Sequence, residues 1–298
     1  MGIFFSVMLP VMAIFALGYG LQRWKKIQVK QVSAVSIYIF MPFFFFTSLY
    51  EAKFDQRYTI MVVFILFLLV LMVIISKIMG KLFHWSKTVE SASILSTAFM
   101  NGGNYGIPMI LFTFGQVALP YAVFYMVIQS MVINFFGVYF ANRDAEGMAR
   151  AIRKVFQMPA TYAAIIAILL NVFHIKLPAP VYDTIKTVGD GSIPLMMVIL
   201  GMQLATIRSL RFNWNVLLSS VIVRMLVSPL IAWGFVSLLD IGPIIGGIII
   251  IMSAMPSAAS ATMYAIEFDT EPELVSSVTL VTTLFSFVSI TVLLNVLT

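Results

Sequence analysis

Long apolar runs alternate with short polar connections along the whole chain of 298 residues. A membrane-spanning helix needs about 20 consecutive, mostly apolar residues, and the pattern predicts ten such spans. The sequence therefore predicts an all-α membrane protein. The expected ranges are 3–21, 31–50, 58–79, 91–114, 118–140, 159–175, 187–207, 214–238, 243–266 and 274–297.

The fourth and ninth spans are interrupted near their middle by small, polar and proline residues. The fourth contains the run Asn101–Pro108, and the ninth contains the run Met255–Ser260. In hydrocarbon an unpaired backbone amide or carbonyl costs several kcal/mol, so irregular backbone at this depth must be buried in protein or line a cavity. Paired breaks in corresponding positions of two halves indicate the binding site of a secondary transporter.

Composition agrees with a membrane protein and argues against disulfides, a metal centre and an enzyme active site. Hydrophobic residues make up 61% of the chain and charged residues 10%, and the mean hydropathy is +1.03. The chain has no cysteine and two histidines, which excludes disulfides and argues against a metal centre. The spans also lack the nucleophile, base and central carboxylates of an active site. We expect no enzyme, no metal and no cofactor.

The basic residues are distributed unevenly between the two sets of alternate loops. Thirteen of the 18 Lys and Arg residues fall in one set and four in the other, while Arg224 lies inside a span. Since short cytoplasmic loops carry the excess of Lys and Arg, we expect a multi-pass protein of the cytoplasmic membrane with both termini outside the cytoplasm. This topology explains the basic loops, so we expect no nucleic-acid partner.

The proline positions indicate an old internal duplication. Pro42 and Pro108 are 66 residues apart in the first half, and Pro194 and Pro256 are 62 residues apart in the second. Each half holds five predicted spans, and an odd number forces the second copy to insert upside down, as in many secondary transporters. The expected organisation is a first repeat at 1–140, a cytoplasmic linker at 141–158 and a second inverted repeat at 159–298.

Two broken helices that cross near the midplane would bring four half-helix ends together. The N-terminal ends carry partial positive charge and free N–H groups, so they can hold an anion without Lys or Arg. No span has a carboxylate near its centre, although cations in membranes usually need one. The pattern therefore favours a small organic anion as the substrate.

Three segments resemble the auxin efflux carrier family, and the resemblance covers essentially the whole chain. That family includes plant auxin exporters and prokaryotic permeases of malate or malonate. The resemblance implies two inverted five-helix repeats with extracellular termini. It also implies that spans 1, 2, 6 and 7 form a dimerising scaffold, and that spans 3–5 and 8–10 form a transport domain moving as an elevator. The segments are Asn101–Gly115, Gly191–Gly201 and Met255–Pro272.

The same resemblance places the substrate contacts on both breaks and on the fifth span. There Asn134 takes the place of a substrate-facing aromatic residue, which argues against an aromatic, auxin-like acid. The expected function is efflux of a small organic anion, such as an auxin-like acid, malate or malonate. The expected substrate-binding residues are Asn101, Gly102, Gly103, Asn104, Tyr105, Pro108, Gln129, Asn134, Pro256, Ser257 and Ser260.

Two other functions remain open at the level of sequence. A sodium-coupled organic-anion symporter similar to bile-acid carriers would bind sodium through carbonyls and hydroxyls, which leave little trace in sequence. A sensor on the same fold would bind a ligand without moving it. The sequence also does not identify the partner of Arg224, which must be paired or reach water at that depth.

Overall fold

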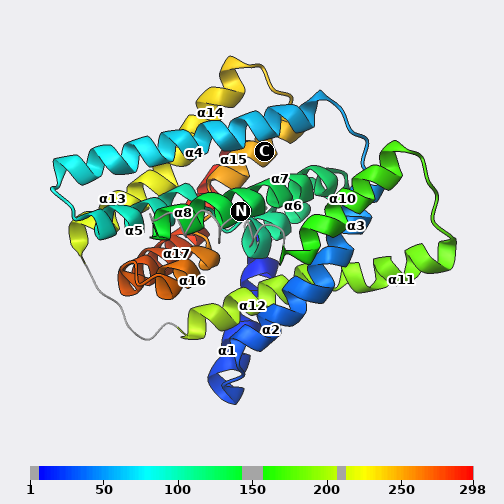
Figure 1. Ribbon diagram of the computed structural model, residues 1–298, viewed down its shortest axis with the longest axis horizontal. Coiled ribbons are helices and arrows are strands. Elements are labelled where there is room, and N and C mark those ends of the chain that lie inside the picture. The colour runs from blue at the N-terminus through cyan, green and yellow to red at the C-terminus, as the bar shows by residue number, and fades with distance from the viewer. Residues whose placement is uncertain (1–6, 143–156, 207–212, 298) are drawn as a thin grey trace.

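The computed structural model describes residues 7–142, 157–206 and 213–297, and these residues form helices joined by short turns, without a β-strand (Figure 1). Most of the linker expected at 141–158 and the start of the span expected at 3–21 lie outside the described residues. So do six of the basic residues assigned to the cytoplasmic side, namely Arg143, Arg150, Arg153, Lys154, Arg208 and Arg211.

Up to residue 142 the α-helices are α1 (Leu9–Lys25), α2 (Val29–Val35), α3 (Met41–Tyr50), α4 (Gln56–Leu82), α5 (Lys87–Ala98), α6 (Ile107–Phe114), α7 (Leu119–Val132) and α8 (Val138–Asn142). Three π-helical turns, Ser36–Phe40, Gly102–Gly106 and Ile133–Gly137, lie between them, with a 3-10 turn at Gln116–Ala118.

From residue 159 onward the α-helices are α10 (Pro159–Val172), α11 (Ala179–Asp190), α12 (Ser192–Thr206), α13 (Trp214–Ile222), α14 (Ser228–Leu238), α15 (Pro243–Ser253), α16 (Ala259–Glu267) and α17 (Pro272–Leu297). A π-helical turn, Val223–Val227, joins α13 to α14.

Local sequence sets where several helices begin. The Asp55 side chain accepts a hydrogen bond from the Arg57 backbone N–H at the start of α4, and Ser86 Oγ accepts one from Val89 at the start of α5. Both caps satisfy N–H groups that have no partner within the helix. At α10, α15 and α17 a proline is the first residue, where its missing N–H is not needed.

Six of the described helices, counted through the short turns that interrupt some of them, are long and apolar enough to cross a membrane. They correspond to the second, third, fifth, seventh, eighth and tenth predicted spans. The predicted sixth span is the shorter apolar helix α10, and the predicted fourth and ninth spans are divided. The six are Val29–Tyr50, Gln56–Leu82, Gln116–Ala141, Ala179–Thr206, Trp214–Leu238 and Pro272–Leu297. The described part of the chain is therefore all-helical, with several helices that are suited to a membrane by their length and composition.

The seventh span begins earlier than the sequence pattern predicts. We expected it to begin at residue 187, but helix α11 already starts at Ala179, directly after Pro178. Most of α11 is exposed, and an ion pair of 2.9 Å between Lys186 and Asp190 supports its last turn. A hydropathy pattern overlooks the start of such a helix because charged and hydroxyl side chains interrupt its apolar residues from Asp183 to Asp190.

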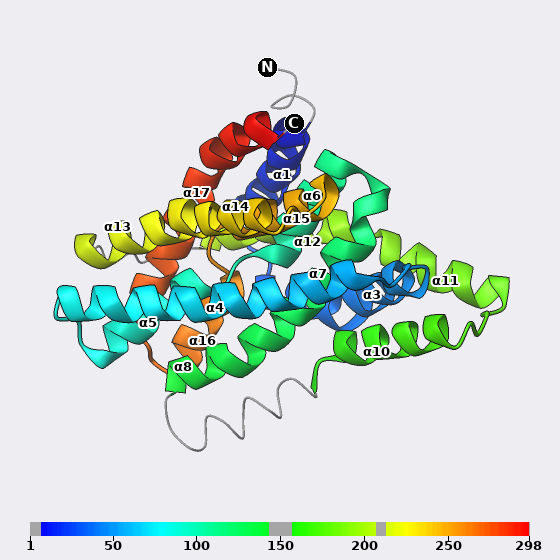
Figure 2. The same ribbon diagram turned by 90° about the horizontal axis from the view of Figure 1, so that it is seen from above.

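The helices separate into two groups that both views show on opposite sides (Figures 1 and 2). Helices α3, α10 and α11 pack together on one side, whereas α5, α13 and α16 lie on the other. The long helix α4 contacts α5 at one end and α7 along its course. Helix α1 packs along α12, and the π-helical turn Gly102–Gly106 contacts α12 between the two groups.

Helices α1 and α12 approach each other closely through two glycines. A Cβ atom on Gly18 would lie 2.1 Å from the Val198 carbonyl oxygen, and one on Gly201 would lie 2.0 Å from the Phe15 carbonyl oxygen. Neither position can carry a larger side chain unless the two helix backbones separate. Small residues at close helix crossings are a common packing device in membranes.

Candidate functional site

Both predicted interruptions are present as breaks in the helices. Helix α5 ends at Ala98, the chain continues in extended conformation through Phe99, and a π-helical turn starting at Gly102 leads into α6. Helix α15 ends at Ser253, and α16 starts only at Ala259. Each of the two segments thus consists of two half-helices joined by a short nonhelical stretch.

The two nonhelical stretches pair with each other in antiparallel orientation. The Asn101 backbone N–H donates to the Pro256 carbonyl at 2.8 Å, and the Ala258 N–H donates to the Phe99 carbonyl at 3.0 Å. Met100 and Ser257 face each other between these bonds. Because each break supplies acceptors for the other, the crossing satisfies backbone groups that would otherwise be left without partners in the membrane interior.

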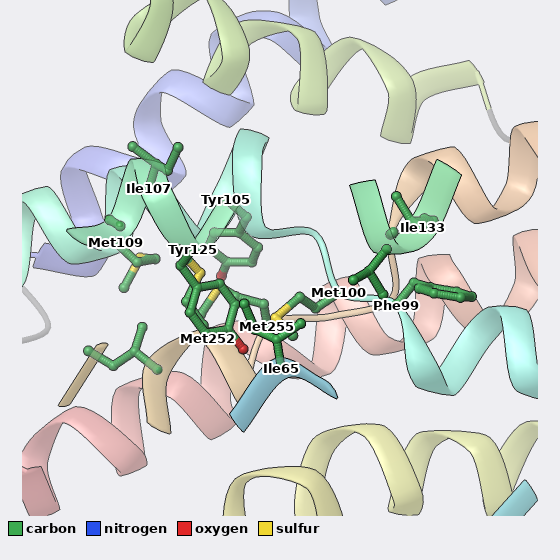
Figure 3. Packing of buried hydrophobic residues seen from close by; sticks show 14 of the residues in the cluster. Ile65, Phe99, Met100, Tyr105, Ile107, Met109, Tyr125, Ile133, Met252 and Met255 are labelled. Atoms are coloured by element: carbon green, nitrogen blue, oxygen red, sulfur yellow. The ribbon is translucent and has the colours of Figure 1, made fainter. Parts of the chain in front are cut away.

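Large buried side chains enclose the crossing (Figure 3). Phe99, Met100, Tyr105, Met252 and Met255 are all buried, and Figure 3 shows them gathered around the paired segments. These side chains fix the position of the breaks and keep lipid away from them.

The glycines of the first break allow methionine side chains to pack against its backbone. A Cβ atom on Gly103 would lie 2.8 Å from Met126 Cε, and one on Gly106 would lie 2.6 Å from Met252 Sδ. Met126 belongs to α7, so the fifth predicted span packs directly against the first break.

Helix polarity divides the four ends at the crossing into two kinds. Helices α5 and α15 end there with their C-termini, whereas α16 and the π-helical turn that leads into α6 begin there. A helix C-terminus carries about −0.5 elementary charge and an N-terminus about +0.5. The crossing therefore contains two sites of opposite character, one attracting cations and the other attracting anions.

Arg224, on the π-helical turn between α13 and α14, occupies the cation-attracting side. Its side chain is fully buried, with 0% exposure. Nη1 donates to the Thr97 carbonyl at 2.8 Å, and Nη2 donates to the Ser253 carbonyl and, at 2.7 Å, to Ser228 Oγ. The partner that sequence alone did not identify is thus the pair of C-terminal ends of α5 and α15.

Asn101 directly precedes the π-helical turn that leads into α6, on the anion-attracting side of the crossing. Its side chain is 6% exposed, and Nδ2 has no hydrogen-bond partner among the described residues. Its own carbonyl accepts a hydrogen bond of 3.1 Å from the Gly106 N–H, which holds the π-helical turn. A buried amide donor without an acceptor beside helix N-termini is suited to bind an anion.

The second break contributes Pro256, Ser257 and Ser260. Pro256 and Ser257 are buried, and Ser260 is half-buried in the first turn of α16. The Ser257 N–H donates to Thr282 Oγ1 at 3.2 Å, and its hydroxyl accepts from Thr279 at 3.4 Å. Helix α17 therefore positions this break through its threonines, which sequence reasoning did not single out.

The remaining expected residues of the first break occupy different environments. Asn104 is half-buried, while Gly102, Gly103 and Pro108 are buried. Tyr105 is fully buried, its hydroxyl accepts from Ser286 at 3.2 Å, and its ring packs edge-on against Phe15 of α1 with centroids 5.2 Å apart. Tyr105 thus connects the first break to α17 and to α1.

The two polar residues expected on the fifth span lie in different surroundings. Gln129 is buried on α7, three residues beyond Met126. Asn134 is buried in the following π-helical turn, and its Oδ1 accepts a hydrogen bond from the Tyr264 hydroxyl of α16. Asn134 therefore joins the fifth span to the half-helix that follows the second break.

A cavity of about 400 Å³ lies between α6 and α12. None of the expected substrate-binding residues lines it. The side chains around it come from α1, α3, α6, α7, α11, α12 and the 3-10 turn before α7, and they are Ile14, Phe44, Leu111, Phe112, Gln116, Leu119, Lys186, Asp190, Ile193, Pro194 and Met197.

Comparison with known proteins identifies the family. The family described as Membrane transport protein matches residues 3–294. An uncharacterized transporter of Methanothermobacter thermautotrophicus is 26% identical over 303 residues, which cover 96% of this chain and 95% of that protein. An uncharacterized transporter of Methanocaldococcus jannaschii is 26% identical over 298 residues, which cover 96% of each chain. The chain therefore belongs to this membrane transport protein family, the auxin efflux carrier family that its sequence motifs resemble.

Proposed function

We propose that this protein is a secondary transporter that exports a small organic anion across the cytoplasmic membrane. The observation that carries the proposal is the unpartnered Nδ2 of Asn101, buried where two half-helices begin. The two helix N-termini together supply about +1 elementary charge, which balances one carboxylate. Malate, malonate and an auxin-like acid are the candidate substrates. The helix ends match the single carboxylate of an auxin-like acid and one of the two carboxylates of malate or malonate, and the polar Asn134 favours malate and malonate.

Several contacts support an internal repeat, and five predicted spans in each half make it an inverted one. If α10 and α12 are the counterparts of α1 and α3, then the packing of α1 on α12 corresponds to that of α10 on α3. The contact of α4 with α5 corresponds in the same way to that of α14 with α15, and the contact of α6 with α7 to that of α16 with α17.

The same contacts support a division into a scaffold and a transport domain. The scaffold would contain α1, α2, α3, α10, α11 and α12, and two such scaffolds would form a homodimer. The transport domain would contain α4 to α8 and α13 to α17, with the crossing at its centre. Moving this domain past the scaffold would carry the substrate from one side of the membrane to the other, as in an elevator.

The direction of transport follows from charge. In a cell whose interior is electrically negative, one elementary charge gains about 2.3 kcal/mol per 100 mV. An anion therefore moves outward down this potential, and export needs no coupling ion.

The test is flux of radiolabelled malate, malonate and indole-acetate in proteoliposomes. The measurement is made with an imposed membrane potential, and with or without sodium and pH gradients. Flux that follows the potential alone supports electrogenic anion export and identifies the substrate. Binding without flux contradicts the proposal in favour of a sensor, and strict sodium dependence contradicts it in favour of a symporter.

A further inference from the structure

The oxygens that the two Nη atoms of Arg224 contact are of the kind that binds a metal cation, while Nε has no partner among the described residues. Its guanidinium donates to two backbone carbonyls, Thr97 and Ser253, and to the hydroxyl of Ser228. Carbonyl and hydroxyl oxygens are also the ligands that hard cations take. In transporters with broken helices, unwound carbonyls and half-helix C-termini coordinate the coupling sodium ion.

The hydroxyls of Thr97 and Ser253 are bonded elsewhere, within their own helices. The Thr97 hydroxyl donates to the Ser93 carbonyl, and the Ser253 hydroxyl donates to the Ile249 carbonyl, each at 2.7 Å within its own helix. Neither hydroxyl therefore competes with the guanidinium for a carbonyl at the helix ends. Ser228 Oγ completes the arrangement by donating to the Ser253 carbonyl at 2.9 Å.

The charges at this point are balanced without a carboxylate. The C-termini of α5 and α15 contribute about −0.5 elementary charge each, which together offset the single positive charge of the guanidinium. No group of three or more His, Cys, Asp or Glu residues that could hold a metal ion occurs in the part of the chain that the structure describes.

We propose that the Arg224 guanidinium is a built-in substitute for a coupling cation, so that transport proceeds without an inorganic ion at the crossing. This inference rests on the proposed transport function and specifies its energy source. Arg224 is here a positioning residue. It joins the C-terminal ends of both half-helix pairs, so that the opposite N-terminal ends stay together and directed at the substrate.

The first test needs no variant. Flux of the transported anion is measured in proteoliposomes in sodium, potassium and choline media of equal ionic strength at a fixed membrane potential. The expected result is the same flux in all three. Flux that requires sodium or potassium would overturn the proposal. Absence of flux in every medium would instead count against the transport function.

The second test removes the guanidinium and does not depend on the substrate. Arg224→Gln is expected to lower flux by about tenfold or more and to leave an empty cation position at the crossing. Sodium or guanidinium ions should therefore raise the thermal unfolding midpoint of purified Arg224→Gln above its value in choline, while the wild-type midpoint stays the same in these salts. The same response of both proteins would contradict the proposal.

Two further variants serve as controls. Lys176→Gln removes a positive charge from an exposed position and should behave like the wild type in both assays. Arg224→Lys keeps the charge but loses the forked geometry that bridges two carbonyls. It should therefore retain part of the flux and show no response to sodium. If Arg224→Gln does not fold, the partial flux of Arg224→Lys tests the positioning role by itself, and flux equal to that of the wild type would contradict that role. A sodium response of Arg224→Lys equal to that of Arg224→Gln would show that charge at this site is not what matters.

Discussion

A buried donor without an acceptor destabilises a folded protein by about 1–3 kcal/mol, because the group has given up its hydrogen bonds to water. Asn101 Nδ2 is such a donor, 6% exposed as a residue and without a partner in the described chain. A substrate oxygen at this position would remove the penalty. The free-energy cost of burying Nδ2 is therefore explained if this amide binds the substrate.

Asn101→Ala is expected to lower flux without lowering stability. A hydrogen bond to a charged group contributes about 1.5–3 kcal/mol, so flux at low substrate concentration should fall by about tenfold to a hundredfold. The thermal unfolding midpoint should stay the same or rise, since Nδ2 has no intramolecular bond to lose and its removal relieves the penalty of a buried donor without a partner. Proteoliposome flux at equal protein content and a melting curve in detergent measure the two quantities.

The matched control for this substitution is Asn295→Ala. Asn295 is exposed, and its Nδ2 donates to the Thr291 carbonyl on the surface of α17. This variant should transport like the wild type. Near-normal flux in Asn101→Ala would exclude Asn101 from the site.

At the scale of elements, α1 and α12 pack closely through Gly18 and Gly201. Gly18→Ala or Gly201→Ala would place a Cβ atom 2.1 or 2.0 Å, respectively, from a backbone oxygen of the other helix. That oxygen is part of the helix backbone, so it cannot move away unless the helix moves with it. We expect each variant to lose about 1–3 kcal/mol or more of stability, seen as a lower thermal unfolding midpoint.

Gly20→Ala on the same helix provides the comparison. Nothing lies within 4 Å of a Cβ atom at Gly20, and alanine is favoured over glycine in a helix by up to about 1 kcal/mol. Its midpoint should stay equal or rise slightly. Equal midpoints for Gly18→Ala and Gly20→Ala would show that α1 and α12 do not pack this closely.

The presence of the two breaks could be predicted from sequence, but the hydrogen-bond partners of Arg224 beside them could not. Small residues and prolines within an apolar run indicate a break wherever they occur. The second break, at residues 254–258, largely coincides with Met255–Ser260. The first break, at residues 99–101, overlaps Asn101–Pro108 only at Asn101, and the rest of that run is already helical. The partners of Arg224 are backbone carbonyls at helix ends, which any residue type can supply. One signal was available, because Ser228 follows Arg224 by four residues and so lies on the same helix face.

At the scale of the whole molecule, orientation can be tested with little interference because the chain contains no cysteine. Lys176 and Lys87 are both exposed and belong to loops assigned to opposite sides. In intact cells, a membrane-impermeant maleimide should label Lys176→Cys from outside, whereas Lys87→Cys should react only after the cells are opened. The reverse pattern would place the termini in the cytoplasm.

Elevator motion requires that contacts between scaffold and transport domain break during each cycle, while contacts within a domain persist. Phe15 of α1 and Phe287 of α17 lie across the proposed boundary, with ring centroids 6.2 Å apart. Tyr58 of α4 and Phe124 of α7 lie within the transport domain, with centroids 4.8 Å apart. In both pairs the two rings are in contact. A covalent link within the first pair would prevent the transport domain from moving past the scaffold, whereas a link within the second pair would not.

The difference can be tested by measuring flux in two double-cysteine variants, each with a cysteine pair at one of these positions and a mercury ion that bridges the pair. Bridging Phe15→Cys with Phe287→Cys should stop transport, and removing the mercury with excess thiol should restore it, because the link holds the transport domain against the scaffold. Bridging Tyr58→Cys with Phe124→Cys should leave flux close to that of its own unbridged form. Continued transport with the first pair fully bridged would mean that α1 and α17 do not move past each other, and the anion would then have to cross by a local rearrangement at the helix crossing.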